Sequence, residues 1–265
     1  MTFEHLRCAV QGGVGVVTLH RPPVNAVHQP MYRELQEAFG RPQEALPGAR
    51  TIVLTGEGRH FCGGNDLHEF ETLTPESSPA RMLEVRKAFF AIQDCPLPVI
   101  GAVRGVALGT GLAIAASCDL VVAARGAQLG LPELAVGVMG GARHLGRLVP
   151  QPIVRWMFLS ADPVPVERLA QLGAVLEVVE PDELLDAARR RAERIARHSP
   201  VALRCAKRAL NAIETMDLQP GYAYEQSLTT ELSGHPDAKE AVRAFFERRD
   251  PVYVGDAAQA SDAGG

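Results

Sequence analysis

The chain contains few aromatic residues, no paired cysteines and no long apolar run. Aromatic residues make up 5% of its 265 residues, which argues against the stacking platforms that bind single-stranded nucleic acid. The five cysteines are scattered without a CxxC pair, so neither a zinc site nor a disulfide framework is indicated. No run approaches the roughly eighteen apolar residues of a transmembrane helix. We therefore expect reduced thiols, no metal and no membrane partner.

The charge and the N-terminus narrow the class of protein further. The formal net charge of −4 argues against a phosphate backbone as the main partner, so we predict no nucleic-acid binding. The N-terminus lacks the basic start and apolar core of a signal peptide, and we expect a cytoplasmic protein. Apolar residues make up 46% of the chain and charged residues 22%, as in ordinary globular domains. A chain of this length forms one large α/β domain or two smaller ones.

The stretch from Pro96 to Gly141 organises the predicted fold. An apolar run at 97–103 is long enough for one buried strand, and a glycine-bearing turn follows at 104–111. A small-residue helix at 112–118 then leads into a second buried strand at 119–124. Strand, turn, helix and strand predict a βαβ unit whose turn directs backbone N–H groups toward a ligand.

The rest of the chain alternates strands and helices before it becomes all-helical. Further strands are expected at 14–19, 51–55 and 175–179, and helices at 30–39, 81–93, 143–149, 153–160 and 166–172. A polar, proline-containing stretch at 71–79 is interpreted as a mobile surface loop. From Pro181 onward, four more helices are expected at 184–197, 201–213, 222–232 and 237–248. The last residues, 256–265, are expected to form a disordered tail.

Two glycine-rich loops each follow a buried strand and offer backbone donors. One spans 56–67 and contains Gly64-Asn65-Asp66, and the other contains Gly109-Thr110-Gly111 at the start of a helix. Two N–H groups that converge on one oxygen form an oxyanion hole, which stabilises a developing negative charge. The spacing does not show that the loops converge, and two separate tight turns fit it as well.

Ordered motifs run along nearly the whole chain, roughly from Thr18 to Tyr253. They are His20-Arg21-Pro22 with Asn25-Ala26, Phe61-Cys62-Gly63-Gly64-Asn65-Asp66-Leu67, Pro98 to Gly111, Cys118 to Ala123, Leu129 to Gly137, and Pro251-Val252-Tyr253. Together and in this order they resemble the crotonase superfamily, also called the enoyl-CoA hydratase/isomerase family. Several motifs in register are far more specific than any one of them.

The resemblance implies an α/β protein with the crotonase (ClpP-like) fold, in which repeated ββα units precede a helical trimerisation region. On this chain the core with its acyl-CoA site would span 1–195, and the helical region would span 196–255. The implied substrate is an acyl-CoA thioester, and the implied assembly is a homotrimer or a dimer of trimers (a hexamer). No cofactor is expected, because coenzyme A is part of the substrate.

The resemblance also assigns the chemistry. The two oxyanion donors would be the backbone N–H groups of Asn65 and Thr110, which hold the thioester carbonyl as it becomes an enolate. Thr110 stands where the family usually has glycine, so the pocket would be narrowed there. The two glutamates of typical hydratases would fall at Ala113 and Glu133, and only the second is a carboxylate. The apolar neighbours of Glu133 predict partial burial and a raised pKa, whereas without the motif a surface carboxylate is the expected reading.

Substrate contacts are implied around both loops. The predicted binding residues are Val24, Ala26, Gly63, Gly64, Asp66, Leu67, Gly109, Ala113 and Gly141. Asp66 is expected to cap the following helix rather than to act in catalysis. Cys62 is interpreted as a small apolar filler, and the Arg189-Arg190-Arg191 run as a solvated helix face.

A single carboxylate favours double-bond isomerisation over hydration. Moving a double bond from the 3- to the 2-position needs one base that removes a proton from C2 and returns it to C4. Adding water needs both activation of the water and a source of the proton delivered to the α-carbon. We therefore predict an enoyl-CoA isomerase with Glu133 as the base. A 2-enoyl-CoA hydratase and a non-catalytic acyl-CoA-binding protein are the alternatives, and thioester hydrolysis or decarboxylation is a more distant one.

Overall fold

The main sheet of the protein, here a computed structural model that describes residues 1–255, has six strands. The predicted tail at 256–265 lies outside the described residues. In sheet order the strands are β1 (Leu6–Gln11), β2 (Val14–Leu19), β3 (Thr51–Gly56), β4 (Val99–Val103), β6 (Leu120–Ala124) and β9 (Glu177–Val179). The β1–β2 pair is antiparallel, and every other neighbouring pair is parallel.

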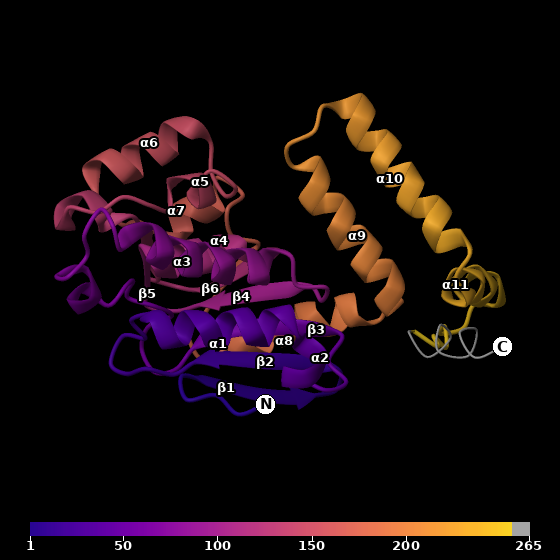
Figure 1. Cartoon of the computed structure of the whole chain (residues 1–265). Coiled ribbons are helices and arrows are strands. Elements are labelled where there is room, and N and C mark those ends of the chain that lie inside the picture. Colours follow the sequence, from indigo (N-terminus) through magenta and orange to yellow (C-terminus); the bar gives the residue numbers. More distant parts are fainter. Residues whose placement is uncertain (256–265) are drawn as a thin grey trace.

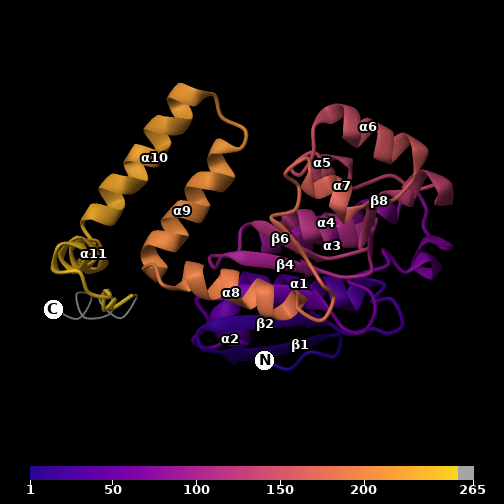
Figure 2. The same cartoon turned by 180° about the vertical axis from the view of Figure 1, so that it is seen from behind.

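Most residues of the four central strands, β2, β3, β4 and β6, are buried on both faces of this sheet, as expected where helices cover a parallel sheet on both sides. Val17 and Leu19 of β2 face the larger core, and Val14 and Val16 face a second apolar cluster. The larger core receives helices α1 (Gln29–Gly40), α3 (Ser78–Gln93) and α4 (Thr110–Ser117). The second cluster receives α8 (Leu184–Ala196), which crosses the opposite face of the sheet (Figures 1 and 2).

The βαβ unit expected in the stretch from Pro96 to Gly141 is confirmed. Strands β4 and β6 pair in parallel, from Ile100 with Leu120 to Val103 with Ala123, and α4 connects them. The glycine turn also contains a short strand, β5 (Val106–Leu108), which begins a second sheet with β7 (Gln128–Gly130) and β8 (Val164–Pro165). This second sheet brings the glycine turn beside the chain that leads to Glu133.

Shorter elements connect these layers. They are α2 (Pro42–Ala45), the 3-10 helices η1 (Leu67–Phe70) and η2 (Pro132–Val136), α5 (Ala142–Leu145), α6 (Gln151–Ser160) and α7 (Val166–Ala170). The sequence analysis missed strand β1 and the second sheet, and the helix predicted at 143–149 is α5, which ends at Leu145. Helix α3 begins at Ser78 inside the predicted loop 71–79, and α10 (Leu218–Ser233) begins at Leu218 rather than at 222. Both helices carry a proline in their first turn, where its missing N–H costs no helical hydrogen bond.

The C-terminal helices α9 (Pro200–Ile213), α10 (Leu218–Ser233) and α11 (Pro236–Glu247) project away from the sheet as an arm (Figure 1). Lys207 of α9 ties the arm to the core: its Nζ donates to the Leu97 carbonyl at 3.1 Å and lies 2.9 Å from Asp119 Oδ2. Among the described residues, no helix has the length and apolar content needed to cross a membrane. The division of the chain at residue 195 stays a prediction.

Candidate active site

The two glycine loops lie side by side. The Cys62 N–H donates to the Val106 carbonyl at 3.0 Å, and the Leu108 N–H donates to the Cys62 carbonyl at 3.0 Å. A Cβ added to Gly111 would lie 2.3 Å from the Cys62 carbonyl oxygen, so only glycine permits this approach. The convergence that the loop spacing left open is therefore a property of the tertiary structure.

The backbone N–H groups of Asn65 and Thr110 donate no hydrogen bond to any other residue in the described part of the chain. Thr110 is the first residue of α4, where the N–H groups of a helix have no intrahelical acceptor. The neighbours of Asn65 are held in place, because the Val27 N–H donates to the Gly64 carbonyl at 2.8 Å and the Asp66 N–H to the Val27 carbonyl at 2.9 Å. One unused donor on each loop is what an oxyanion hole requires.

Tyr32 of α1 connects the two loops through hydrogen bonds of its hydroxyl to their side chains. Its buried hydroxyl donates to Asn65 Oδ1 at 2.6 Å and lies 2.8 Å from Thr110 Oγ1. Since the tyrosine proton goes to Asn65, the Thr110 hydroxyl donates to Tyr32. Burial raises the pKa of Tyr32, so the phenol stays protonated. The sequence analysis missed this residue, although a tyrosine on the apolar face of a predicted helix signals a hydroxyl that needs a buried partner.

Glu133 lies in η2 beside the glycine turn. It is 6% exposed, and its Oε2 atom is buried without a hydrogen-bond partner in the described residues. A Cβ on Gly109 would lie 2.8 Å from Glu133 Oε1, and the Gly109 N–H donates to the Gly130 carbonyl at 2.9 Å. Burial raises the pKa of Glu133 to about 7, which confirms the expected shift. The carboxylate can therefore accept and return a proton near neutral pH.

Ala113, at the position of the second expected carboxylate, is buried in α4. Its methyl group can neither accept nor donate a proton. Glu133 is therefore the only carboxylate at the two positions where the resemblance leads us to expect a pair.

Most of the other predicted binding residues belong to the first loop or contact it, whereas Gly141 lies against Leu131. The Gly63 N–H donates to the Val24 carbonyl at 2.7 Å, and Arg21 Nη1 donates to the Ala26 carbonyl at 2.9 Å. Asp66 caps η1 by accepting from the His68 N–H at 3.1 Å, which confirms its expected role.

Arg21 Nη2 also donates to Asp66 Oδ2 at 2.6 Å. One arginine therefore connects the backbone at Ala26 with the end of the first glycine loop. Leu67 is 51% exposed at the start of η1. Gly141 precedes α5 with φ 78°, and a Cβ there would lie 2.5 Å from Leu131 Cδ2.

Cys62 and His144 are two further titratable groups near the loops. The Cys62 thiol is fully buried and burial raises its pKa to about 12, so it is not a nucleophile at neutral pH. His144 packs edge-on against Phe89 at 5.0 Å between ring centroids, and burial lowers its pKa. The described residues contain no group of three or more His, Cys, Asp or Glu side chains placed to hold a metal ion.

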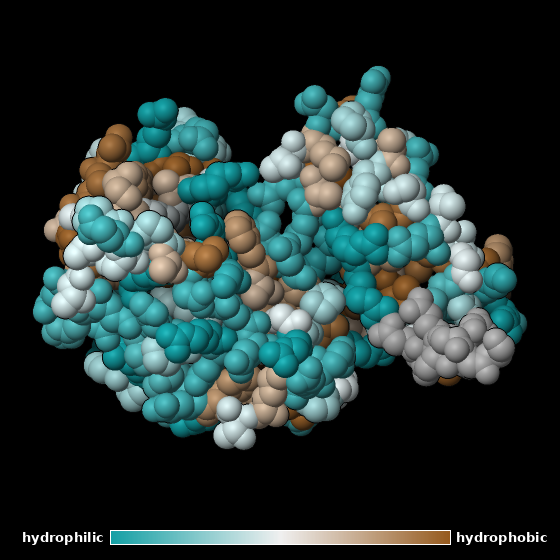
Figure 3. All heavy atoms as spheres, viewed as in Figure 1, coloured by the Kyte–Doolittle hydropathy of each residue, from teal (hydrophilic) through white to brown (hydrophobic). Residues whose placement is uncertain are grey.

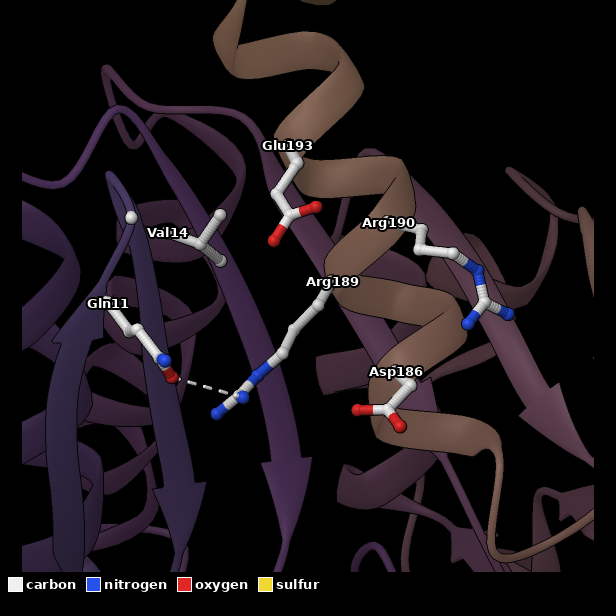
Figure 4. Close-up of a pocket in the computed structure, with 7 residues that line it drawn as sticks. Gln11, Val14, Asp186, Arg189, Arg190 and Glu193 are labelled. Atoms are coloured by element: carbon white, nitrogen blue, oxygen red, sulfur yellow. Dashed lines mark hydrogen bonds between the residues drawn. The ribbon is translucent and has the colours of Figure 1, made fainter.

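A hollow of about 400 Å³ between β1, β2 and α8 contains part of the arginine run (Figure 4). Arg189 extends toward Gln11, with 3.4 Å between Nη1 and Oε1, and Arg190 points away from it. Asp186 and Glu193 balance the two positive charges. The run is therefore a solvated face with no excess positive charge, as the sequence analysis expected.

Comparison with known proteins identifies the family. The model of the enoyl-CoA hydratase/isomerase family matches residues 9–256. The chain belongs to the enoyl-CoA hydratase/isomerase family, within the crotonase superfamily. It is 35% identical over 253 residues to the 2,3-dehydroadipyl-CoA hydratase of Escherichia coli, covering 92% of this chain and 96% of that protein. It is also 36% identical over 228 residues to the (7aS)-7a-methyl-1,5-dioxo-2,3,5,6,7,7a-hexahydro-1H-indene-carboxyl-CoA hydrolase of Rhodococcus jostii, covering 83% and 86%.

Solved structures share the fold of this chain. DspI of Pseudomonas aeruginosa superposes with a TM-score of 0.90 at 30% identity, covering 95% of this chain and 98% of that one. An enoyl-CoA hydratase of Mycobacterium smegmatis superposes with a TM-score of 0.88 at 30% identity, covering 94% and 98%. The predicted crotonase fold is therefore confirmed, and the protein is an acyl-CoA enzyme of the enoyl-CoA hydratase/isomerase family. The names of the relatives include hydratases and a hydrolase.

Proposed function

We propose that the protein isomerises 3-enoyl-CoA to 2-enoyl-CoA thioesters. The observation that carries this proposal is the pairing of one buried carboxylate, Glu133, with Ala113 at the position of the second. Glu133 removes a proton from C2 of the substrate, and the electron pair moves into the thioester carbonyl to form a dienolate. Glu133 then returns the proton to C4 and the double bond becomes conjugated with the thioester, so no water and no second acid are consumed.

The unused N–H groups of Asn65 and Thr110 stabilise the dienolate oxygen in this mechanism. Donors placed in advance around a developing oxyanion typically contribute about 10²- to 10³-fold in rate each. The hydrogen bonds of Tyr32 to both residues support the role by holding the two loops at a constant separation.

Hydration of 2-enoyl-CoA is the second candidate, and the likeness to the 2,3-dehydroadipyl-CoA hydratase favours it. In that reaction Glu133 would activate a water molecule, and the proton for the α-carbon would have to pass through the same carboxylate. One group would then perform both steps.

One assay separates the candidates. The purified protein is given 3-enoyl-CoA and 2-enoyl-CoA in separate reactions, and the absorbance of the conjugated thioester is followed. We expect the absorbance to rise with the 3-enoyl substrate and Glu133→Gln to reduce that rate by about 10²- to 10⁴-fold. A fall with the 2-enoyl substrate alone would establish hydration instead. Binding of both thioesters without turnover of either would indicate a non-catalytic binding protein.

A further inference from the structure

The side-chain amide of Asn65 has its oxygen in use and its nitrogen free. Asn65 Oδ1 accepts from the Tyr32 hydroxyl at 2.6 Å. Asn65 Nδ2 donates no hydrogen bond to any residue in the part of the chain that the structure describes. Asn65 is half-buried, and Nδ2 is not one of the buried side-chain atoms without a partner, so this nitrogen retains accessible surface. Its two N–H bonds are therefore available to a ligand.

Tyr32 determines which end of the amide is free. Its hydroxyl has a single proton, which it donates to Asn65, and it accepts the proton of the Thr110 hydroxyl at 2.8 Å. Tyr32 is fully buried, so its hydroxyl has no water to turn to. An amide that is held by its oxygen presents its nitrogen away from that partner. The two N–H bonds of Nδ2 are thus oriented before any ligand binds, which lowers the entropic cost of binding one.

The free nitrogen lies beside the unused backbone N–H of the same residue. Val27 occupies one edge of the segment, because its N–H donates to the Gly64 carbonyl at 2.8 Å and its carbonyl accepts from the Asp66 N–H at 2.9 Å. The Asn65 N–H, between these two groups in a bridge with Val27, points to the opposite edge. Tyr32 lies against the side-chain oxygen. The side of Asn65 that stays open is therefore the side of the proposed oxyanion hole.

The proposed base lies across Gly109 from this segment. A Cβ on Gly109 would be 2.8 Å from Glu133 Oε1 and 4.0 Å from the Cα of Gly64, the residue before Asn65. A thioester whose carbonyl oxygen accepts from the Asn65 backbone N–H directs its C2 toward Glu133 in the proposed reaction. C3 is then the first carbon of the acyl chain whose substituent is free to meet the Asn65 amide.

The two donors of Asn65 match the spacing of two oxygens in one ligand. Within one asparagine, covalent geometry keeps the backbone nitrogen and Nδ2 about 3–5 Å apart in every rotamer. The oxygen of a thioester and an oxygen on C3 of the same acyl group are about 3 Å apart when both point the same way. A plain alkyl chain in this place would cover Nδ2 without offering it an acceptor, and a covered donor without an acceptor is costly.

We propose that the Asn65 amide binds an oxygen on C3 of the acyl group, so that the site prefers 3-oxoacyl-CoA thioesters to those with a plain alkyl chain. This deepens the proposed function and rests on it only in that a thioester carbonyl binds at the backbone N–H groups of Asn65 and Thr110. The preference is a property of binding and does not depend on which reaction Glu133 performs.

The test compares the dissociation constants of 3-oxobutyryl-CoA and butyryl-CoA, measured by calorimetry. Neither acyl group contains a carbon–carbon double bond, so neither thioester is isomerised or hydrated. We expect 3-oxobutyryl-CoA to bind at least about threefold more tightly, which is typical of one additional hydrogen bond. Equal or weaker binding of 3-oxobutyryl-CoA would overturn the proposal.

Two variants of Asn65 locate the effect. Asn65→Asp keeps an oxygen for the Tyr32 hydroxyl but replaces Nδ2 by a second oxygen, which cannot donate. We expect the preference to disappear or to reverse, because a negatively charged oxygen then faces the oxygen on C3. Asn65→Ala removes the amide, keeps the backbone N–H and should lower the preference by about three- to tenfold. Asn211→Ala, at a half-buried asparagine of α9, is the control and should keep the preference.

A preference that survives both substitutions of Asn65 would show that the backbone donors and Glu133 produce it, and would contradict the proposal. If Asn65→Ala does not fold, Asn65→Asp still decides the question, because it retains the hydrogen bond with Tyr32. The preference without isomerase activity would overturn the proposed reaction and leave this inference standing. Isomerase activity without the preference would do the reverse, and failure of both thioesters to bind would overturn both.

Discussion

The surroundings of Glu133, the base proposed for the reaction, raise its pKa. Glu133 sits among apolar side chains beside Gly109, and burial without a partner for Oε2 disfavours its charged form. A carboxylate with a pKa near neutrality is both ionised often enough to accept a proton and acidic enough to return it. The same residue in an exposed turn would be fully ionised and a much weaker base.

The pH dependence of kcat/KM should follow the ionisation of Glu133. The base acts only when ionised, and burial raises the Glu133 pKa to about 7. We expect kcat/KM for isomerisation to be level above this value and to fall roughly tenfold per pH unit below it. The measurement is the rate of formation of conjugated thioester from pH 5 to 9. A midpoint near the ordinary glutamate value would show that Glu133 is solvated in the free enzyme, and the residual activity of Glu133→Gln should not follow this profile.

Tyr32 is a positioning residue, and loss of its hydroxyl should displace the backbone donors of both loops. Tyr32→Phe leaves Asn65 Oδ1 and the Thr110 hydroxyl without their buried partner, which costs about 1–3 kcal/mol of unfolding free energy. We expect kcat to fall at least about tenfold, with binding of a saturated acyl-CoA little changed, because misplaced donors act mainly on the transition state. Tyr222→Phe, at a tyrosine 59% exposed on α10, is the matched control. An unchanged kcat in Tyr32→Phe would mean that the donors are held by the backbone alone.

At the level of elements, the site depends on how closely α4 approaches the first loop. Strand β5 pairs with the loop around Cys62, and α4 then begins directly against the same backbone. Small residues make this possible, since four of the eight residues of α4 are alanine or glycine and the helix is buried along its whole length. The N–H groups at the start of the helix are thereby brought to the loop without a side chain between them.

Gly111→Ala tests this approach. The new Cβ would lie 2.3 Å from the Cys62 carbonyl oxygen, so helix and loop must separate. A shift of about 1 Å in catalytic geometry typically costs about 10²-fold, and we expect kcat/KM to fall by at least that factor. Thermal unfolding should show a loss of about 1–3 kcal/mol. Gly40→Ala, at the end of α1 with open space around its Cβ, should leave both quantities unchanged. Full activity of Gly111→Ala would show that the loop separation is not critical.

For the molecule as a whole, the arm carries several large apolar side chains that are exposed to solvent. Leu218 is 87% exposed, Phe245 79% and Phe246 78%. Apolar side chains also gather over α6, on the part of the molecule that faces the arm across an open space (Figure 3). Patches of this kind mark surfaces that are covered by another protein. Together with the arm that stands away from the core, they support the prediction of a homotrimer or a dimer of trimers.

Association should therefore depend on α11. The double variant Phe245→Asp/Phe246→Asp places two charges where aromatic rings are to be buried, and we expect it to dissociate the assembly. Light scattering after size exclusion should give three or six times the chain mass of 28.5 kDa for the unmodified protein and a single chain mass for the variant. Val10→Asp on the edge strand β1 is the control and should keep the assembly. A monomeric unmodified protein would contradict the prediction.

The amino-acid sequence alone determined five strands of the main sheet (β2, β3, β4, β6 and β9), the βαβ unit, and the presence of one glutamate, Glu133, with alanine at position 113 where a second is expected. These follow from local periodicity, glycine spacing and motif order, which a chain carries before it folds. Only the tertiary structure decided that the loops of Asn65 and Thr110 meet, that Tyr32 connects them and that the nitrogen of the Asn65 amide stays free. Each of those facts depends on contacts between residues far apart in the chain, and such contacts are set by packing rather than by local pattern.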